Sequence, residues 1–280
     1  MPRLSIITIN RNNAVGLEAT LDSVWNRQPS FTDFEHIVID GASTDGSTTV
    51  TDRYADRLAY YVSEPDSGIY NAMNKGILHA SGDYLLFLNS GDRLSDDSLI
   101  AIFSCEADED ILYADLDLAS DDGNLTITYP DRLTLPFMLE SAIGHPASFI
   151  RRRMFERGMY DETLKICSDW TFFMDRIIME GATTRHIPVV ASIFDQTGIS
   201  ADPKSAALIK AERNAYIHRH FPESVLELAR EYTLREQALD IMSKHRTDAL
   251  LSSRWVQRKA RQCIKALMRI DRLIHKRHQH

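Results

Sequence analysis

The first 92 residues alternate short apolar runs with segments of helical spacing, and this alternation restricts the possible folds more than any other feature. The apolar runs, rich in β-branched or aromatic residues, cover residues 4–10, 34–39, 58–62 and 84–88. Between them, residues 14–26 and 69–79 repeat apolar side chains along one helical face. Strands that alternate with helices form a mostly parallel sheet with right-handed crossovers and flanking helices. The sequence therefore predicts an α/β fold.

A polar loop follows each of the four predicted strands. The carboxyl ends of parallel strands form one rim of the sheet, where open α/β sheets bind their ligands. The polar side chains expected at this rim are Asn10, Asp40, Asp66 and Asp92. A single loop of this kind is equally well explained as a polar turn. Four such loops at one rim favour a binding site.

The glycine patterns that cradle phosphate are absent from the sequence. It contains neither G-x-G-x-x-G nor G-x-x-x-x-G-K-[ST], which argues against an ordinary dinucleotide fold or P-loop. Acids dominate the predicted rim instead. Mg²⁺ and Mn²⁺ bind carboxylate oxygens and bridge phosphate oxygens, so a bound diphosphate is expected to be held through one of these cations.

The charge is unevenly distributed along the chain. The formal net charge is −8, yet residues 254–280 carry nine Lys or Arg against the single acid Asp271. A basic segment on an acidic body indicates a polyanionic partner or an anionic membrane surface. A packed helix with a solvated basic face explains it equally well. We find no nucleic-acid recognition motif and expect no nucleic-acid partner.

The cysteines and the apolar runs indicate the cellular compartment of the protein. The three cysteines, Cys105, Cys167 and Cys263, are widely spaced without a zinc pattern, which fits a reducing cytosol. No run reaches the length of a membrane span, and the first apolar run ends too early for a signal peptide. A cytoplasmic protein is expected, with peripheral attachment to the inner face of the plasma membrane as an open alternative.

Four segments together resemble a known family. Residues 4–12, 38–46, 64–76 and 82–92 are similar to the family 2 inverting glycosyltransferases of the GT-A fold. The phrases SEPDSGIYNAMNKGI and GDYLLFLNSGD are typical of bacterial exopolysaccharide enzymes of the colanic-acid type. The resemblance covers residues 3–200 and implies a GT-A domain over residues 1–203. Pro203 marks the predicted boundary, and the helix-like pattern after it, interrupted near Phe221-Pro222, predicts a helical C-terminal extension over residues 204–280 with the basic tail.

The resemblance also implies an activity and a donor site. Such enzymes move a sugar from a UDP- or GDP-linked nucleotide-diphospho-sugar to a hydroxyl of a saccharide or lipid-linked saccharide acceptor, here in exopolysaccharide or surface glycan biosynthesis. Asp40 would contact the nucleotide base. The other donor-site residues implied by the resemblance are Thr8, Asn10, Arg11, Gly41, Asp66, Asn74, Lys75, Asn89 and Ser90.

The chain departs from the family at the metal motif. Asn89 and Gly91 occupy the acidic positions of the usual Asp-x-Asp. Asp92 is left as the metal carboxylate, with Asn89 as a weaker ligand or a ribose contact. The departure keeps open an alternative function, a non-catalytic nucleotide-sugar-binding or scaffold protein.

Asp169 is the candidate catalytic base. Ser168 is predicted to cap a helix over residues 168–178, and an acid such as Asp169 is commonplace in a first helical turn. In the family, an acid here accepts the proton of the attacking hydroxyl. His145, in a strand predicted at 144–150, would contact phosphate, metal or acceptor, or else serve structure alone. Trp170 and Ser200 are further candidate contacts to acceptor or phosphate.

Overall fold

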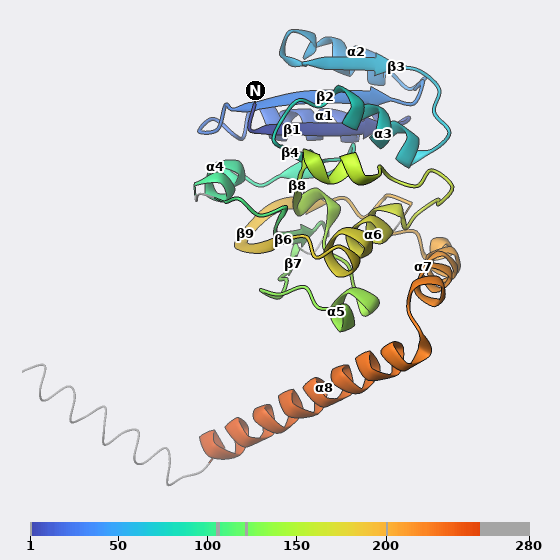
Figure 1. The fold of residues 1–280 in the computed structure, drawn as a ribbon. Helices are drawn as coiled ribbons and strands as arrows, with labels where there is room; N and C mark the ends of the chain where they lie inside the picture. Colours follow the sequence, from blue (N-terminus) through green and yellow to red (C-terminus); the bar gives the residue numbers. More distant parts are fainter. Residues whose placement is uncertain (1, 105–106, 121–122, 200, 253–280) are drawn as a thin grey trace, which may run out of the picture. The chain divides into compact units, whose positions relative to one another are not determined.

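The computed structural model describes residues 2–104, 107–120, 123–199 and 201–252, with side chains described as far as residue 239 (Figure 1). The chain forms two compact units, Met1–Phe221 and Pro222–His280. The first unit contains the sheet and both cavities discussed below.

Nine strands of the described chain form one sheet, in the order β3-β2-β1-β4-β8-β6-β9-β5, with β7 paired to β6 (Figure 1). The first four are parallel: β1 (Leu4–Asn10), β2 (Phe34–Asp40), β3 (Tyr60–Ser63) and β4 (Tyr84–Phe87). β1 lies at their centre and is buried at every position. The predicted parallel, helix-flanked part of the fold is confirmed.

The second half of the sheet is mixed rather than parallel. It consists of β5 (Arg93–Leu94), β6 (Ile111–Leu118), β7 (Leu125–Ile127), β8 (Ser148–Arg151) and β9 (Thr184–Phe194). β8 runs antiparallel to both β4 and β6, and β7 runs antiparallel to β6. β9 runs parallel to β6 and antiparallel to β5.

Helices cover both faces of the parallel half. α1 (Ala14–Trp25) and α2 (Ser47–Asp52) follow β1 and β2, and α3 (Ile69–His79) follows β3. The crossover through α3 returns along the sheet toward β4, opposite in direction to those through α1 and α2. Right-handed crossovers in opposite directions put α3 on the other face of the sheet. The remaining helices of the first unit are α4 (Ser98–Phe103), α5 (Leu135–Glu140), α6 (Ser168–Phe173), a π-helical turn (Met174–Met179) and α7 (Ala206–His220).

Two local predictions were wrong. The segment predicted as a strand at 144–150 begins with a 3-10 turn, His145–Ala147, and only then becomes β8. Pro146 lacks the N–H that a strand ladder needs, so pairing starts after it. Ser168 is not the N-cap of α6, because Cys167 holds that position and Ser168 Oγ accepts the Asp161 N–H at 2.6 Å.

α7 belongs to the first unit. The Tyr216 ring lies 5.4 Å from that of Trp170, and Glu212 accepts backbone hydrogen bonds from the segment before α6. The compact units therefore divide at Phe221/Pro222, whereas the sequence predicted a division after Pro203, which here starts a 3-10 turn.

The second unit is described through α8 (Glu223–Ser252). The basic segment 254–280 lies outside the described residues. Within the part of the chain that is described, no helix has the length and apolar character needed to cross a membrane.

Candidate active site

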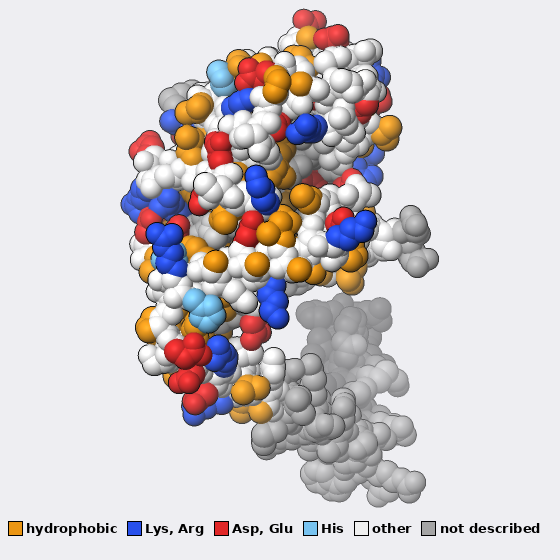
Figure 2. All heavy atoms as spheres, turned by 90° about the vertical axis from the view of Figure 1, so that its right-hand side faces the viewer, with side chains coloured by type: hydrophobic (Ala, Val, Ile, Leu, Met, Phe, Trp, Pro, Cys, Tyr) orange, Lys and Arg blue, Asp and Glu red, His pale blue; other side chains and the backbone are white. Residues whose placement is uncertain are grey.

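Two cavities adjoin at the carboxyl rim of the sheet, which faces the viewer in Figure 2 with acidic and basic side chains interspersed. The polar cavity, about 390 Å³, is lined by the loops after β1, β4 and β9, including Arg11, Asn12, Asn13, Ser90, Asp92 and Asp195. The apolar cavity, about 310 Å³, is lined mainly by α3, the 3-10 turn before β8, α6 and α7. Ile69, Asn89, Phe194 and Ile199 line both cavities.

Asp40 is enclosed by hydrogen-bond donors. Its Oδ1 accepts from Asn10 Nδ2 at 2.7 Å and Ser43 Oγ at 2.5 Å. Its Oδ2 accepts from the Ser43 N–H at 2.8 Å and Ser63 Oγ at 2.6 Å. Burial alone would raise the pKa of this carboxyl, but these hydrogen bonds outweigh it and lower the pKa. With about four acceptor sites per carboxylate, Asp40 has none left for a nucleotide base unless a neighbour moves.

Thr8 and Asn10 lie beneath the rim rather than on it. Thr8 is fully buried, with Oγ1 2.9 Å from His36 Nε2. Asn10 is 4% exposed, and its Nδ2 donates to Asp40 and Ser43, while its Oδ1 has no hydrogen-bond partner. Neither lines the polar or the apolar cavity, and the contacts of Asn10 with Asp40 and Ser43 connect β1 to the loop after β2.

Arg11, Gly41 and Asp66 lie together beside the polar cavity. The Arg11 guanidinium lies 3.7 Å from Asp66 Oδ1, and the Arg11 side chain is two-thirds exposed (66%). A Cβ on Gly41 would lie 2.3 Å from Asp66 Oδ2, so only glycine permits this approach. Arg11 is thus the member of this group that can reach a ligand.

Asn74 and Lys75 hold loops in place. Asn74 donates to Tyr160 O at 2.9 Å and accepts from the Tyr160 N–H at 3.0 Å. Lys75 Nζ donates to Pro65 O at 3.0 Å and pairs with Glu64 at 2.7 Å. Neither side chain lines the polar or the apolar cavity, and their role in a donor pocket stays a prediction.

Asp92 faces a second acid that the sequence reasoning missed. Asp92 is 2% exposed; its Oδ1 accepts the Asp195 N–H at 2.9 Å, and its Oδ2 has no hydrogen-bond partner. Gly91 has φ 109°, and a Cβ there would lie 2.3 Å from Asp195 Oδ2. Burial, with a contribution from the Asp195 charge, raises the pKa of Asp92 to about 7. The signal available in the sequence was an acid directly after the β9 strand.

The donor atoms around Asp92 fit a hard divalent cation. Asp92 and Asp195 supply carboxylates, and Asn89 Oδ1 is a second buried oxygen without a partner. Among the described residues, no group of three His, Cys, Asp or Glu side chains could complete a site by itself. Mg²⁺ characteristically binds one or two carboxylates and takes its remaining ligands from water and phosphate.

Asp169 lies at the apolar cavity with one oxygen held and one available. Its Oδ1 accepts the Trp170 N–H at 2.9 Å and lies 3.0 Å from Tyr70 Oη, whose single proton is shared with Ile166 O at 2.5 Å. Within the described chain, no hydrogen bond engages its Oδ2. Burial, followed by the charge of Asp169, raises the pKa of Tyr70, which keeps that hydroxyl protonated as a donor. Sequence reasoning did not identify Tyr70 as a partner.

The remaining candidates are placed as follows. His145 lines the apolar cavity, but its Nε2 lies 2.7 Å from Tyr160 Oη, and burial lowers its pKa. Trp170 is 2% exposed, and its Nε1 donates to Met138 O at 2.9 Å. Both help to form the wall of the cavity. Ser200 lies outside the described residues.

The fold is that of the GT-A glycosyltransferases. It is similar to S. aureus TarS 1-349 in complex with UDP-GlcNAc, with a TM-score of 0.61, 18% identity and coverage of 79% of this chain and 68% of that one. It is also similar to the mannosyltransferase PcManGT from Pyrobaculum calidifontis in complex with GDP-Man and Mn²⁺, with a TM-score of 0.53, 17% identity and coverage of 92% and 84%.

The chain belongs to glycosyl transferase family 2. The model of that family matches residues 5–159, more than half of the chain. One relative is the PGL/p-HBAD biosynthesis glycosyltransferase of Mycobacterium bovis, 32% identical over 206 residues, which cover 70% of this chain and 78% of the relative. The predicted family is confirmed, and the narrower likeness to colanic-acid-type enzymes stays a prediction.

Proposed function

We propose that this protein is an inverting glycosyltransferase of surface glycan biosynthesis that uses a UDP- or GDP-linked sugar. The observation that carries the proposal is the carboxylate of Asp169, with Oδ1 held by Tyr70 and Oδ2 unengaged in the described chain, at a cavity that adjoins the polar one. Relatives and structural neighbours support it, since the Mycobacterium bovis relative is a PGL/p-HBAD biosynthesis glycosyltransferase and the two similar structures are complexes with UDP-GlcNAc and GDP-Man.

In the proposed reaction, the acceptor oxygen attacks the anomeric carbon of the donor from the side opposite the diphosphate. The bond from that carbon to the diphosphate oxygen breaks with both electrons going to the nucleoside diphosphate. The acceptor proton passes to Asp169 Oδ2. Tyr70 fixes the Asp169 carboxyl through Oδ1 and leaves the other oxygen to work as the general base.

The polar cavity is the proposed donor site. Arg11 can reach a phosphate with its exposed guanidinium, while Asn12 and Asn13 line the wall that follows β1. Asp92, Asp195 and Asn89 would hold Mg²⁺ or Mn²⁺. When bound, such an ion neutralises the charge that develops on a departing diphosphate.

Asp169→Asn tests the proposal against the non-catalytic alternative. The change keeps shape but cannot accept the proton, so release of nucleoside diphosphate should fall by about 10²- to 10⁴-fold. Nucleotide binding, measured by calorimetry, should not change. Asp161→Asn is the control, an exposed acid that lines neither cavity. If Asp169→Asn releases nucleoside diphosphate as fast as the wild type, Asp169 is not the base. If the wild type releases no nucleoside diphosphate with any acceptor, the non-catalytic alternative is favoured.

A further inference from the structure

The two adjoining cavities differ sharply in chemistry. The polar cavity carries Arg11, Asp92 and Asp195. Most side chains of the apolar cavity are hydrocarbon, with walls formed by residues such as Met73, Ile143 and Ile209. A sugar ring carries hydroxyls on most of its carbons, and each hydroxyl buried without a partner costs free energy. The apolar cavity is therefore poorly suited to enclose a free saccharide.

The polar groups of the apolar cavity lie where the chemistry would occur, are already engaged, or belong to the cations Lys165 and Arg213 at α7. Asp169 presents the proposed base, and Asn89 lies at the junction with the polar cavity. The His145 ring is held by Tyr160 at 2.7 Å. An acceptor whose hydroxyl meets Asp169 must place its adjoining part against the hydrocarbon wall.

We propose that the apolar cavity binds the aglycone of the acceptor, so that the acceptor is a glycoside or alcohol with an aryl or alkyl group close to the attacked hydroxyl. This inference rests on the proposed transferase function. A cavity of about 310 Å³ lies at the lower end of the size range of small-molecule sites, roughly 300–1,000 Å³. Burial of hydrocarbon there supplies the binding free energy that a polar acceptor would lack.

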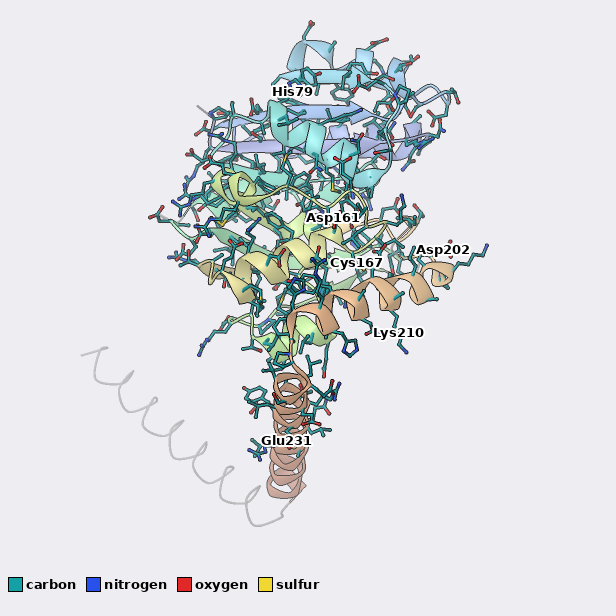
Figure 3. The ribbon with its side chains drawn as sticks, turned by 45° about the vertical axis from the view of Figure 1, so that its right-hand side comes forward. His79, Asp161, Cys167, Asp202, Lys210 and Glu231 are labelled. Carbon is teal, nitrogen blue, oxygen red and sulfur yellow. The ribbon has the colours of Figure 1, made fainter. Side chains whose placement is uncertain are left out.

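α7 forms the outer wall of this cavity and is firmly attached to it. Ile209 and Arg213, one helical turn apart, both line the cavity, and the Arg213 guanidinium lies 4.8 Å above the Trp170 ring. Cys167 Sγ lies 3.7 Å from Ile209 O, and Figure 3 shows Cys167 next to the helix. Leu208, the neighbour of Ile209, is exposed and does not line the cavity.

The first measurement is calorimetric binding of p-nitrophenyl glycosides to the full chain, compared with methyl glycosides of the same sugars. The panel contains both anomers of glucose, galactose, mannose, rhamnose and N-acetylglucosamine. For at least one sugar, we expect the aryl glycoside to bind about tenfold or more tightly than its methyl counterpart, which is the scale of a small hydrophobic contact. Equal binding of aryl and methyl partners throughout the panel, or no binding at all, overturns the inference.

The second measurement locates the binding. Ile209→Asp should remove most of the aryl preference, and Ile209→Ala, which introduces no charge, should reduce it. Leu208→Asp is the matched control, with the same change one position along the same helix, and should keep the preference. Thermal unfolding establishes that each variant is folded. An aryl preference that both Ile209 variants retain places the aglycone elsewhere and refutes the assignment.

The outcome separates this inference from the transferase proposal. Aryl binding that depends on Ile209 supports the cavity assignment. If no UDP- or GDP-sugar then gives release of nucleoside diphosphate, the transferase function is contradicted while the cavity assignment stands. Release of nucleoside diphosphate that is equally fast with aryl and methyl acceptors supports the function and contradicts the cavity assignment.

Discussion

Single side chains beneath the rim decide whether the loops above them keep their shape. Asp40 shows this most clearly, because its carboxylate accepts hydrogen bonds from Asn10, Ser43 and Ser63 and so connects these three residues. The sequence predicts a contact between Asp40 and the nucleotide base. The full burial of Asp40 argues for a position that organises the 41–46 loop.

Asp40→Asn should therefore affect stability as well as binding. An amide offers one acceptor oxygen and points an NH₂ at donors that need an acceptor, so the free energy of unfolding should fall by about 1–3 kcal/mol. Urea denaturation measures this loss, and calorimetry should show weaker nucleotide binding. Glu18→Gln, an exposed acid elsewhere, is the control. If the variant is as stable as the wild type but binds nucleotide more weakly, direct contact between Asp40 and the nucleotide base becomes the better interpretation.

Asp195 is proposed as a cation ligand because the structure places it beside Asp92. Asp195→Asn should weaken Mn²⁺ binding to the donor-free protein by about tenfold or more, because one of two carboxylates facing the cation loses its charge. Calorimetric titration with Mn²⁺ alone measures this without any turnover. Asp202→Asn, an exposed acid that lines neither cavity, should bind Mn²⁺ like the wild type. Unchanged affinity in Asp195→Asn would remove this residue from the proposed cation site.

A buried histidine couples stability to pH. Burial lowers the pKa of His36 from 6.5 to about 3, so between those values the unfolded chain binds a proton that the folded chain does not. Stability then rises with pH across this window and is lost as the pH falls below about 6.5. His36→Gln should flatten the pH dependence of the free energy of unfolding between pH 5 and 7. Two other groups act in the same window, because burial lowers the pKa of His145, which adds to the slope, and raises the pKa of Asp92 to about 7, which opposes it. The test is therefore the difference in slope between the variant and the wild type. A variant with the wild-type slope would contradict the assignment.

At the scale of elements, α7 positions the segment that leads into α6. Glu212 accepts the backbone N–H groups of Lys165, Ile166 and Cys167 at 2.7, 3.1 and 2.9 Å. These three groups immediately precede the helix that carries Asp169. A helix outside the family 2 match of residues 5–159 thus holds the proposed base in place.

Glu212→Ala should lower kcat by about tenfold or more while leaving nucleotide affinity unchanged, because misplacement of a reacting group by about 1 Å costs up to roughly 10²-fold. Glu212→Gln keeps one acceptor oxygen and should restore part of the rate. Lys210→Ala is the control, since Lys210 projects outward from the same helix (Figure 3). An equal loss of rate and nucleotide affinity in Glu212→Ala would indicate general damage to the fold.

Elements with a strong local pattern were the ones that could be predicted from the sequence. β1, β2 and β4 are buried apolar runs, and α3 matches its predicted bounds of 69–79. The predicted metal carboxylate, Asp92, does line the polar cavity. The pairing of Asp92 with Asp195 could not be predicted, because it depends on the contact of β5 with β9 across about 100 residues of chain. Asn74 and Lys75 resemble donor-site residues in sequence, but their contacts with loops are visible only in three dimensions.

At the scale of the whole molecule, the sheet joins two different kinds of site. The parallel half, β3-β2-β1-β4, supplies the loops after β1 and β4 that line the polar cavity. The mixed half supplies the 3-10 turn and β6 that line the apolar cavity, together with α6 and α7. Phe194 and Ile199, at and after the end of β9, line both. In the proposed reaction, this arrangement would bring a charged donor and an apolar acceptor group to Asp169 while each stays in its own cavity.

The charge asymmetry of the whole chain leads to a last prediction. Residues 254–280 carry nine basic residues and one acid, and each Lys or Arg near an anionic lipid surface contributes about 1 kcal/mol to binding. We expect the full chain to sediment with vesicles rich in phosphatidylserine at low salt and to be released at about 0.5 M salt, where charges are screened within a few Å. A chain that ends at residue 253 should stay in solution but still bind nucleotide. Replacing the nine basic residues with Gln keeps the length and should abolish vesicle binding equally. Failure of the full chain to bind at low salt would leave the solvated basic helix as the better interpretation, and binding that survives the Gln substitutions would point to apolar contacts instead of charge.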